Sequence, residues 1–117
     1  MTNFLLRSEE IKHLTDIKGG CIVSNMVTVD GKKVGYAYRE RPDDNFPNDS
    51  GWRFFAGTED DDYTKDSNNF NVLELNTICN YDEAVLPILE SEIGSSFVRS
   101  GNTLIKDKVE TKAQGDN

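Results

Sequence analysis

The acidic residues Glu59, Asp60, Asp61 and Asp62 form the densest group of chemically active side chains in the sequence. Clustered carboxylates can hold a metal ion, act as a catalytic acid–base pair, attract a basic protein, or form a solvated loop. An EF-hand calcium loop needs acids at alternate positions, then a glycine and a late glutamate. The unbroken run lacks that spacing, so we predict no metal site. A solvated loop and a partner-binding surface are the two main interpretations, and calcium or magnesium binding is the lesser alternative.

Covalent catalysis would need a nucleophile with a base beside it. The single histidine, His13, is distant in sequence from both cysteines, Cys21 and Cys79. Zinc would require more such ligands, and the glycine pair at 19–20 lacks the Lys-Ser/Thr of a phosphate-binding loop. The cysteines have apolar neighbours, which is typical of reduced, buried thiols. We therefore predict no catalytic residue, no cofactor and no enzymatic activity.

A second polar group surrounds the segment "RPDDNFPNDSG" at 41–51. Arg39 and Glu40 end one expected strand, and Asp49 precedes Trp52 at the start of the next. If these strands are neighbours, Arg39 reaches Asp49 across the mouth of the loop. The pair then either closes the loop or presents a recognition surface. Trp52 is either a core residue or a partly exposed anchor, because tryptophan is enriched at binding hot spots.

Strands that would position these residues follow from turn signals and alternation. Asp30 and Gly31 predict a hairpin turn between apolar runs at 21–29 and 32–40. Residues 52–57 predict a third strand with Trp52 on one side and Arg53 on the other. Residues 95–106 predict a final hairpin around Ser100-Gly101-Asn102. The first hairpin would place five side chains on one core face: Val23, Val27, Val34, Tyr36 and Tyr38.

Two short helices complete the expected fold. Ser8 caps the first, which ends at the glycine pair 19–20, and Asn80 with Glu83 forms a capping box for the second, through Leu89. Residues 72–78 fit either a strand or a short helix, and 58–71 predict a polar loop. The fold class is α+β, with a mostly antiparallel sheet in one domain over 1–106. Residues 107–117 predict a flexible tail.

Charge excludes one class of partner. The net charge is −8, and residues 40–66 carry nine acids and three bases, hence −6 of it. Nucleic-acid binding needs a basic face, so it is not expected. A basic protein is the electrostatically matched partner. The sequence has neither a secretory signal pattern nor about 20 consecutive apolar residues for a membrane span. We expect a cytoplasmic protein without membrane contact.

Five segments occur here in a recognisable order: "GGCIVS", "VGYAYRERP", "DSGWRFFAGTEDDDY", "LNTICNYD" and "IGSSF". Over residues 19–97 this succession resembles the bacterial immunity-protein family numbered thirty-three, formerly a domain of unknown function. The resemblance implies an α+β fold and a role in polymorphic toxin systems, in which such proteins are encoded beside a toxin and neutralise it. The matching positions are Gly35, Tyr38, Arg39, Glu40, Pro42, Asp49, Ser50, Gly51, Trp52, Phe54, Gly57, Glu59, Asn76 and Thr77.

The function we predict is therefore binding and neutralisation of a basic cognate toxin through the acidic surface at 40–66. Phe55 is a further aromatic candidate within this surface. The alternative is a small-molecule or divalent-metal-binding module, with Arg39, Asp49 and Glu59 around a pocket. The sequence does not indicate an oligomeric state. The predicted partner-binding residues are Arg39, Glu40, Asp49, Trp52, Glu59, Asp60, Asp61, Asp62 and Tyr63.

Overall fold

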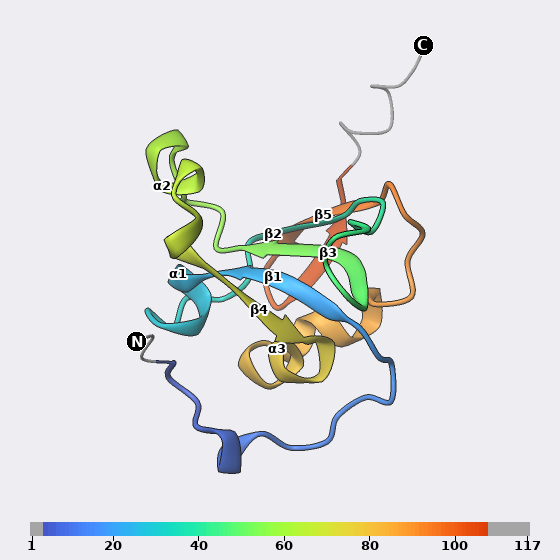
Figure 1. Cartoon of the computed structure of the whole chain (residues 1–117). Helices are drawn as coiled ribbons and strands as arrows, with labels where there is room; N and C mark the ends of the chain where they lie inside the picture. Colours follow the sequence, from blue (N-terminus) through green and yellow to red (C-terminus); the bar gives the residue numbers. More distant parts are fainter. Residues whose placement is uncertain (1–3, 108–117) are drawn as a thin grey trace.

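A computed structural model describes residues 4–107 of the chain (Figure 1). Six strands form one sheet in the order β4-β1-β3-β2-β5-β6. β1 and β3 are parallel, and the other four neighbouring pairs are antiparallel, which confirms the α+β class with a mostly antiparallel sheet. The strands are β1 (Gly20–Ser24), β2 (Tyr36–Arg39), β3 (Asp49–Phe55), β4 (Phe70–Glu74), β5 (Ser96–Ser100) and β6 (Thr103–Lys106).

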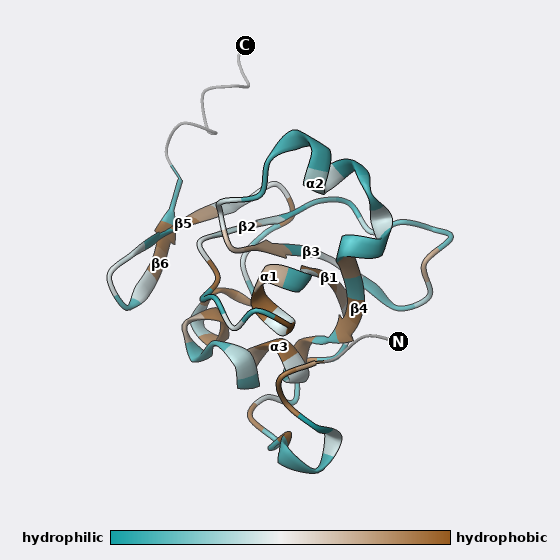
Figure 2. Ribbon diagram, turned by 90° about the vertical axis from the view of Figure 1, so that its left-hand side faces the viewer, coloured by the Kyte–Doolittle hydropathy of each residue, from teal (hydrophilic) through white to brown (hydrophobic). Residues whose placement is uncertain are grey.

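Short helices lie on both sides of this sheet. α3 and the turn η3 lie below it in Figure 1, whereas the hydrophilic α2 lies on the opposite side, as Figure 2 also shows. Within residues 4–107, no helix has the length and apolar character to cross a membrane. The α-helices are α1 (Asn25–Thr28), α2 (Asp61–Lys65) and α3 (Leu75–Tyr81), and the 3-10 turns are η1 (Ser8–Glu10), η2 (Ser67–Asn69) and η3 (Glu83–Ile88).

Strand β3 shows the alternation that the sequence predicts. Trp52 and Phe54 point into the core, where both are fully buried and their rings stack at 5.5 Å between centroids. The indole Nε1 of Trp52 donates a hydrogen bond to the carbonyl of Leu89 at 3.1 Å, so its polar atom is satisfied. Phe97 of β5 completes the cluster with its ring centroid 6.0 Å from that of Trp52. We call this side of the sheet, covered by α3 and η3, the closed face.

The predicted first hairpin is wrong. β1 ends at Ser24, whose side chain accepts a hydrogen bond from the backbone N–H of Met26 and so begins α1. β3 then lies between β1 and β2 in the sheet. Gly35, before β2, packs against β3's end so closely that a Cβ would collide with the carbonyl of Ala56, which explains why glycine stands there.

The core-face assignment of that hairpin was correct in part. Val23, Val27 and Val34 are buried, as expected. Tyr36 and Tyr38 are only half-buried, because Ala37 between them is the residue that faces the core. The two tyrosines therefore point to the other side of the sheet.

The expected N-terminal helix is also wrong. Ser8 begins only the single turn η1, and the chain then runs without regular structure to β1. Two asparagines of α3 bind this segment instead: the side chain of Asn76 accepts from the N–H of Leu14 at 2.7 Å, and that of Asn80 accepts from Lys12 at 2.9 Å. Asn76 and Asn80 are four residues apart on one helix face, so together they replace the backbone hydrogen bonds of a helix.

The undecided segment 72–78 contains both elements, because β4 ends at Glu74 and α3 begins at Leu75. The cap of the next turn is Asp82 and not Asn80, and its side chain accepts from the N–H of Ala84. The predicted loop 58–71 contains α2 and η2. The final hairpin of β5 and β6 is confirmed. Of the predicted tail at 107–117, all but Asp107 lies outside the described residues.

Candidate functional site

The four consecutive acids do not converge on one point. Glu59 folds back onto its own loop, where its two carboxylate oxygens accept the backbone N–H groups of Ala56 at 2.8 Å and Gly57 at 2.9 Å. Burial opposes the ionisation of Glu59, but hydrogen bonds from Ser24, Ala56 and Gly57 outweigh it and lower the pKa of its carboxyl group. Glu59 thus holds the turn after β3.

The other three acids of the run belong to α2. Asp60 is its N-cap and accepts the N–H of Tyr63 at 2.8 Å. Asp61 and Asp62 follow in the first turn, where negative charge is favourable, and both are exposed to solvent. Only Asp61 and Asp62 of the run therefore have carboxylates that are not engaged in holding backbone. Among residues 4–107, no three His, Cys, Asp or Glu side chains are grouped to hold a metal ion.

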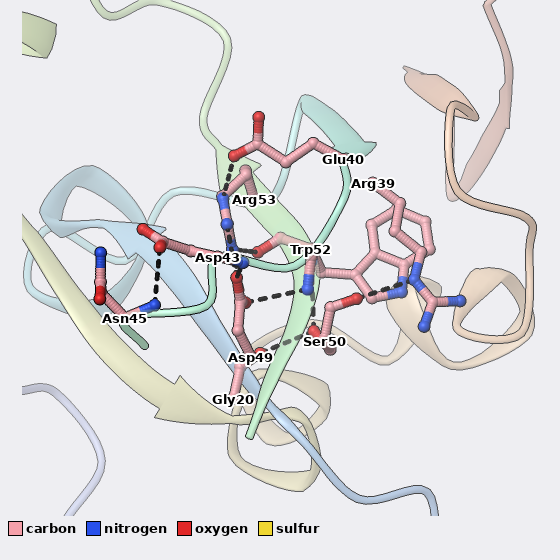
Figure 3. A network of polar contacts seen from close by, with 10 residues as sticks. Gly20, Arg39, Glu40, Asp43, Asn45, Asp49, Ser50, Trp52 and Arg53 are labelled. Atoms are coloured by element: carbon pink, nitrogen blue, oxygen red, sulfur yellow. Dashed lines mark hydrogen bonds and ion pairs between the residues drawn. The ribbon is translucent and has the colours of Figure 1, made fainter. Parts of the chain in front are cut away.

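The main ionic network lies around Arg53, a residue outside the predicted set (Figure 3). Its guanidinium donates to both carboxylate oxygens of Asp49 at 2.8 and 2.9 Å, and its Nε donates to Glu40 at 2.7 Å. The side chains of Arg53 and Asp49 are 6% and 0% exposed, whereas that of Glu40 is 49% exposed. Bidentate pairing of this kind is the strong form of a carboxylate–guanidinium contact.

Asp49 also organises the loop before it. Its carboxylate accepts the backbone N–H groups of Asp43 and Gly51, at 2.8 and 2.9 Å. The hydrogen bond from Arg53, supported by these two, lowers the pKa of the Asp49 carboxyl to about 2. The same contact raises the pKa of the Arg53 guanidinium. The pair is therefore fully charged near neutral pH, and it closes the loop between β2 and β3.

The expected contact between Arg39 and Asp49 is wrong, although β2 and β3 are neighbours. Arg39 lies opposite Trp52 in the register and so belongs to the closed face, whereas Asp49 shares the other face with Arg53. Arg39 donates instead to the carbonyls of Ser50 at 2.9 Å and Ser91 at 2.8 Å. Its guanidinium carbon lies 5.9 Å from the ring centroid of Trp52. Figure 3 shows the two side chains beside one another. Of the two alternatives for Trp52, a core residue or a partly exposed anchor, the first is correct, because Trp52 is 0% exposed.

The side of the sheet away from α3, which we call the open face, carries a row of aromatic rings. Tyr36 and Tyr38 lie beside Phe55, with centroid distances of 5.8 to 6.1 Å among the three rings. Phe70 meets Phe55 edge-on at 5.7 Å, and Tyr63 of α2 meets Phe70 edge-on at 5.9 Å. All five rings are half-buried.

Of these five aromatic residues, only Phe55 and Tyr63 were predicted from the sequence to lie on the partner surface. The other three were not predicted there. The pattern Tyr-Ala-Tyr at 36–38 was the available signal, because a small residue between two tyrosines fits a packed core face with the tyrosines outside. Apolar side chains extend the row on both sides, and the register places them on the same face: Ile22 on β1, Val72 on β4, Val98 on β5 and Ile105 on β6.

A cleft of about 880 Å³ lies between the N-terminal segment, the loop at 46–50 and β4. Arg39 and Asp49 line it, whereas Glu59 does not, so the three residues predicted around a pocket are not brought together. The polar atoms of Arg39 and Asp49 described above are directed at protein groups.

The groups that could act as nucleophiles are poorly placed for it. Cys21 and Cys79 are buried and unbonded to one another. Burial raises the pKa of the Cys21 thiol, and burial with the nearby Asp82 raises that of Cys79 to about 11, so both are protonated thiols near neutral pH. His13 is exposed and hydrogen-bonds to Asp16 at 2.7 Å.

Comparison with known proteins places the chain in a family. The model of the immunity protein Imm33 domain matches residues 21–109, which is most of the sequence. No curated protein and no solved structure is significantly similar to the chain. The structure explains several positions of the resemblance as fold determinants, because Gly35, Asp49, Glu59 and Asn76 each make a contact that positions backbone. The chain belongs to the Imm33 family of immunity proteins, for which a role in binding a toxin, and not catalysis, is expected.

Proposed function

We propose that this immunity protein neutralises its cognate toxin by covering a basic surface of the toxin with the acidic segment 40–66. The family supports a toxin as the partner. The excess of six negative charges in that segment supports a basic surface as the target, since complementary charge speeds encounter and selects the partner. We infer that the protein acts by occupying this surface and without chemistry of its own.

The acids of the segment divide into two groups with different roles. Asp49, Glu59 and Asp60 bind backbone or a buried arginine, so they serve the fold. The exposed acids whose carboxylates hold no backbone are Asp44 before β3, and Asp61 and Asp62 after it. Asp43 and Asp66 are also exposed, but each accepts one backbone N–H, from Asn45 and Asn68, and Glu40 is half-exposed beside Arg53. The single observation that carries the proposal is this unequal division, which leaves exposed negative charge at both ends of β3.

The test reverses charge only where the fold does not need it. We compare the double variant Asp61→Lys/Asp62→Lys with the matched control Glu83→Lys/Glu90→Lys, which changes net charge equally with exposed residues on the closed side. Stopped-flow binding to the purified toxin domain encoded beside the gene should show the association rate falling by about tenfold for the first and little for the second. A weaker salt dependence should accompany the slower rate.

Two outcomes would contradict the proposal. If the protein does not bind that toxin domain and does not restore growth of cells expressing it, the neutralising role is wrong. If both charge-reversed proteins associate equally slowly, or neither slows, then binding does occur but the segment 40–66 does not direct it.

A further inference from the structure

We infer that the toxin docks across the open face of the sheet, on the row of half-buried aromatic rings between the two acidic loops. This inference rests on the proposed function and names the surface, which the acidic segment by itself does not. The acids then form the rim of the contact, and the rings with their apolar neighbours form its centre.

The first argument is the position of the acids relative to β3. The loop 40–48 enters β3 at its first residue, Asp49, and the segment 56–69 leaves it after Phe55. A strand of seven residues separates these two segments by about 20 Å. In Figure 1, α2 and the 40–48 loop lie near opposite ends of β3. A basic surface that contacts both acidic groups must therefore cross the sheet between them.

The second argument is what lies between the two ends. Tyr36, Tyr38 and Phe55 present a continuous aromatic surface, and Phe70 with Tyr63 links it to α2. Tyrosine and phenylalanine combine large contact area with few rotatable bonds, and aromatic residues surrounded by a polar rim are typical of interface centres. Tyrosine faces also bind the cationic side chains of a basic partner.

The third argument is the exposed apolar surface on the same face. Val72 is 60% exposed on β4, and Ile105 is 48% exposed on β6. The two residues lie on opposite edge strands, so they flank the aromatic row on both sides. Exposed apolar side chains beside such a row enlarge the apolar surface that a partner can cover. α3 and η3 bury the apolar residues of the closed face, whereas the apolar residues of the open face keep part of their surface in solvent.

Charge decides which occupant fits. Arg53 is the one arginine that the register places in the middle of the open face, and Asp49 and Glu40 neutralise it. Glu40 binds Arg53, which lies opposite Tyr38 in the register, so this carboxylate belongs to the open face. A second copy of the chain, with net charge −8, would bring acid against acid. A basic protein surface meets opposite charge at both ends.

The experiment places a lysine on each of two equally exposed apolar residues. Val72→Lys lies on the open face, and Ile93→Lys, 54% exposed, lies outside the sheet in the connection between η3 and β5. Titration calorimetry with the purified toxin domain encoded beside the gene should show Val72→Lys raising Kd by about tenfold or more, with Ile93→Lys within about twofold of the natural protein. Tyr38→Ala tests the centre of the face, with its urea midpoint measured to verify that it folds.

Each outcome bears on the inference separately from the proposed function. If the natural protein binds and both Val72→Lys and Tyr38→Ala leave Kd unchanged, the open face is not the docking surface, and the neutralising function still stands. Equal weakening by Val72→Lys and Ile93→Lys shows general charge repulsion and also overturns it. Absence of binding by the natural protein overturns the proposed function and the inference together. Sedimentation that shows a dimer dissociated by Val72→Lys would assign the face to a second copy and overturn the assignment to the toxin.

Discussion

The two faces of the sheet carry nearly the same aromatic packing and differ in what covers them. On the closed face, Trp52 and Phe54 stack at 5.5 Å with 13° between their planes, and both are fully buried. On the open face, Tyr38 and Phe55 stack at 5.9 Å and 15°, and both are half-buried. Ring geometry by itself therefore does not identify a core. The core is identified by the helical elements α3 and η3 that cover one face, because removal from water is what makes the rings stabilising.

The arginines repeat this contrast. Arg39 on the closed side donates to backbone carbonyls of Ser50 and Ser91 and fixes the chain around Trp52. Arg53 on the open side binds two carboxylates, Asp49 and Glu40. The positive charge of Arg53 is therefore already neutralised within the open face. The electrostatic field that a partner meets there is determined by the exposed acids at the two ends of β3.

The largest expected effect is on the free energy of unfolding, which should depend more on the closed face than on the open face. Trp52→Ala should lower the free energy of unfolding by about 3–5 kcal/mol, because it leaves a cavity and an unpaired carbonyl at Leu89. Phe55→Ala, on the same strand but half-exposed, should cost about half as much. Urea denaturation followed by circular dichroism measures both. Equal losses would show that the open face contributes to folding as much as the core, which would break the comparison.

The next effect concerns the ion pair on the open face and depends on pH. Asp49→Asn should lower the free energy of unfolding at pH 7 by about 2–3 kcal/mol, since it removes the charge that Arg53 binds. The folded pKa of Asp49 lies at about 2, below its ordinary value of 3.8. Its contribution is therefore complete above about pH 5 and is lost as the pH falls through 3.8 towards 2. Unfolding measured at pH 7 and pH 2 should show the gap between natural protein and variant narrowing in acid.

The exposed Asp44→Asn is the matched control for that measurement, and it should leave stability unchanged at both pH values within about 0.5 kcal/mol. A gap for Asp49→Asn that stays constant with pH would mean that the carboxylate acts through its shape and hydrogen bonds, and not through its charge.

The smallest effect distinguishes neighbours within the acidic run. Glu59→Ala should cost about 1–2 kcal/mol, because the N–H groups of Ala56 and Gly57 lose their acceptor. Asp61→Ala, two residues later and exposed, should change stability by less than about 0.5 kcal/mol. Thermal unfolding of the two single variants is sufficient. A matching loss for Asp61→Ala would assign that residue to the fold and remove it from the partner surface.

Local patterns predicted those parts of the fold that depend on neighbours in sequence. The alternation of Trp52 and Phe54 against Arg53 and Phe55 gave the correct sides of β3, and the turn at 100–102 gave the final hairpin. The predicted N-terminal helix does not form, although Ser8 followed by two acids is an ordinary signal for the start of a helix. Asn76 and Asn80, more than 60 residues away, bind its backbone in an extended form, and local propensity cannot register such a partner.

The candidate site divided in the same way. The sequence indicated the acids at 59–62 as a group, but it could not tell Glu59 and Asp60, which bind backbone, from Asp61 and Asp62, which are exposed. The sequence also suggested Arg39 as the partner of Asp49. Residues four apart on a strand lie on the same face, however, so the alternation of side chains along β3 places Arg53 beside Asp49.

By itself, the sequence determined the class of this protein: an acidic α+β immunity-protein domain with its negative charge concentrated in 40–66, because composition and motif order are properties of the chain alone. Tertiary structure decided which residues a partner can reach. Inserting β3 between β1 and β2 buried Trp52, turned Tyr36 and Tyr38 outward, and set exposed acids at both ends of a sheet face that α3 and η3 do not cover. Exposure depends on what packs against a residue from distant parts of the chain, and that is settled only when the strands are placed in order.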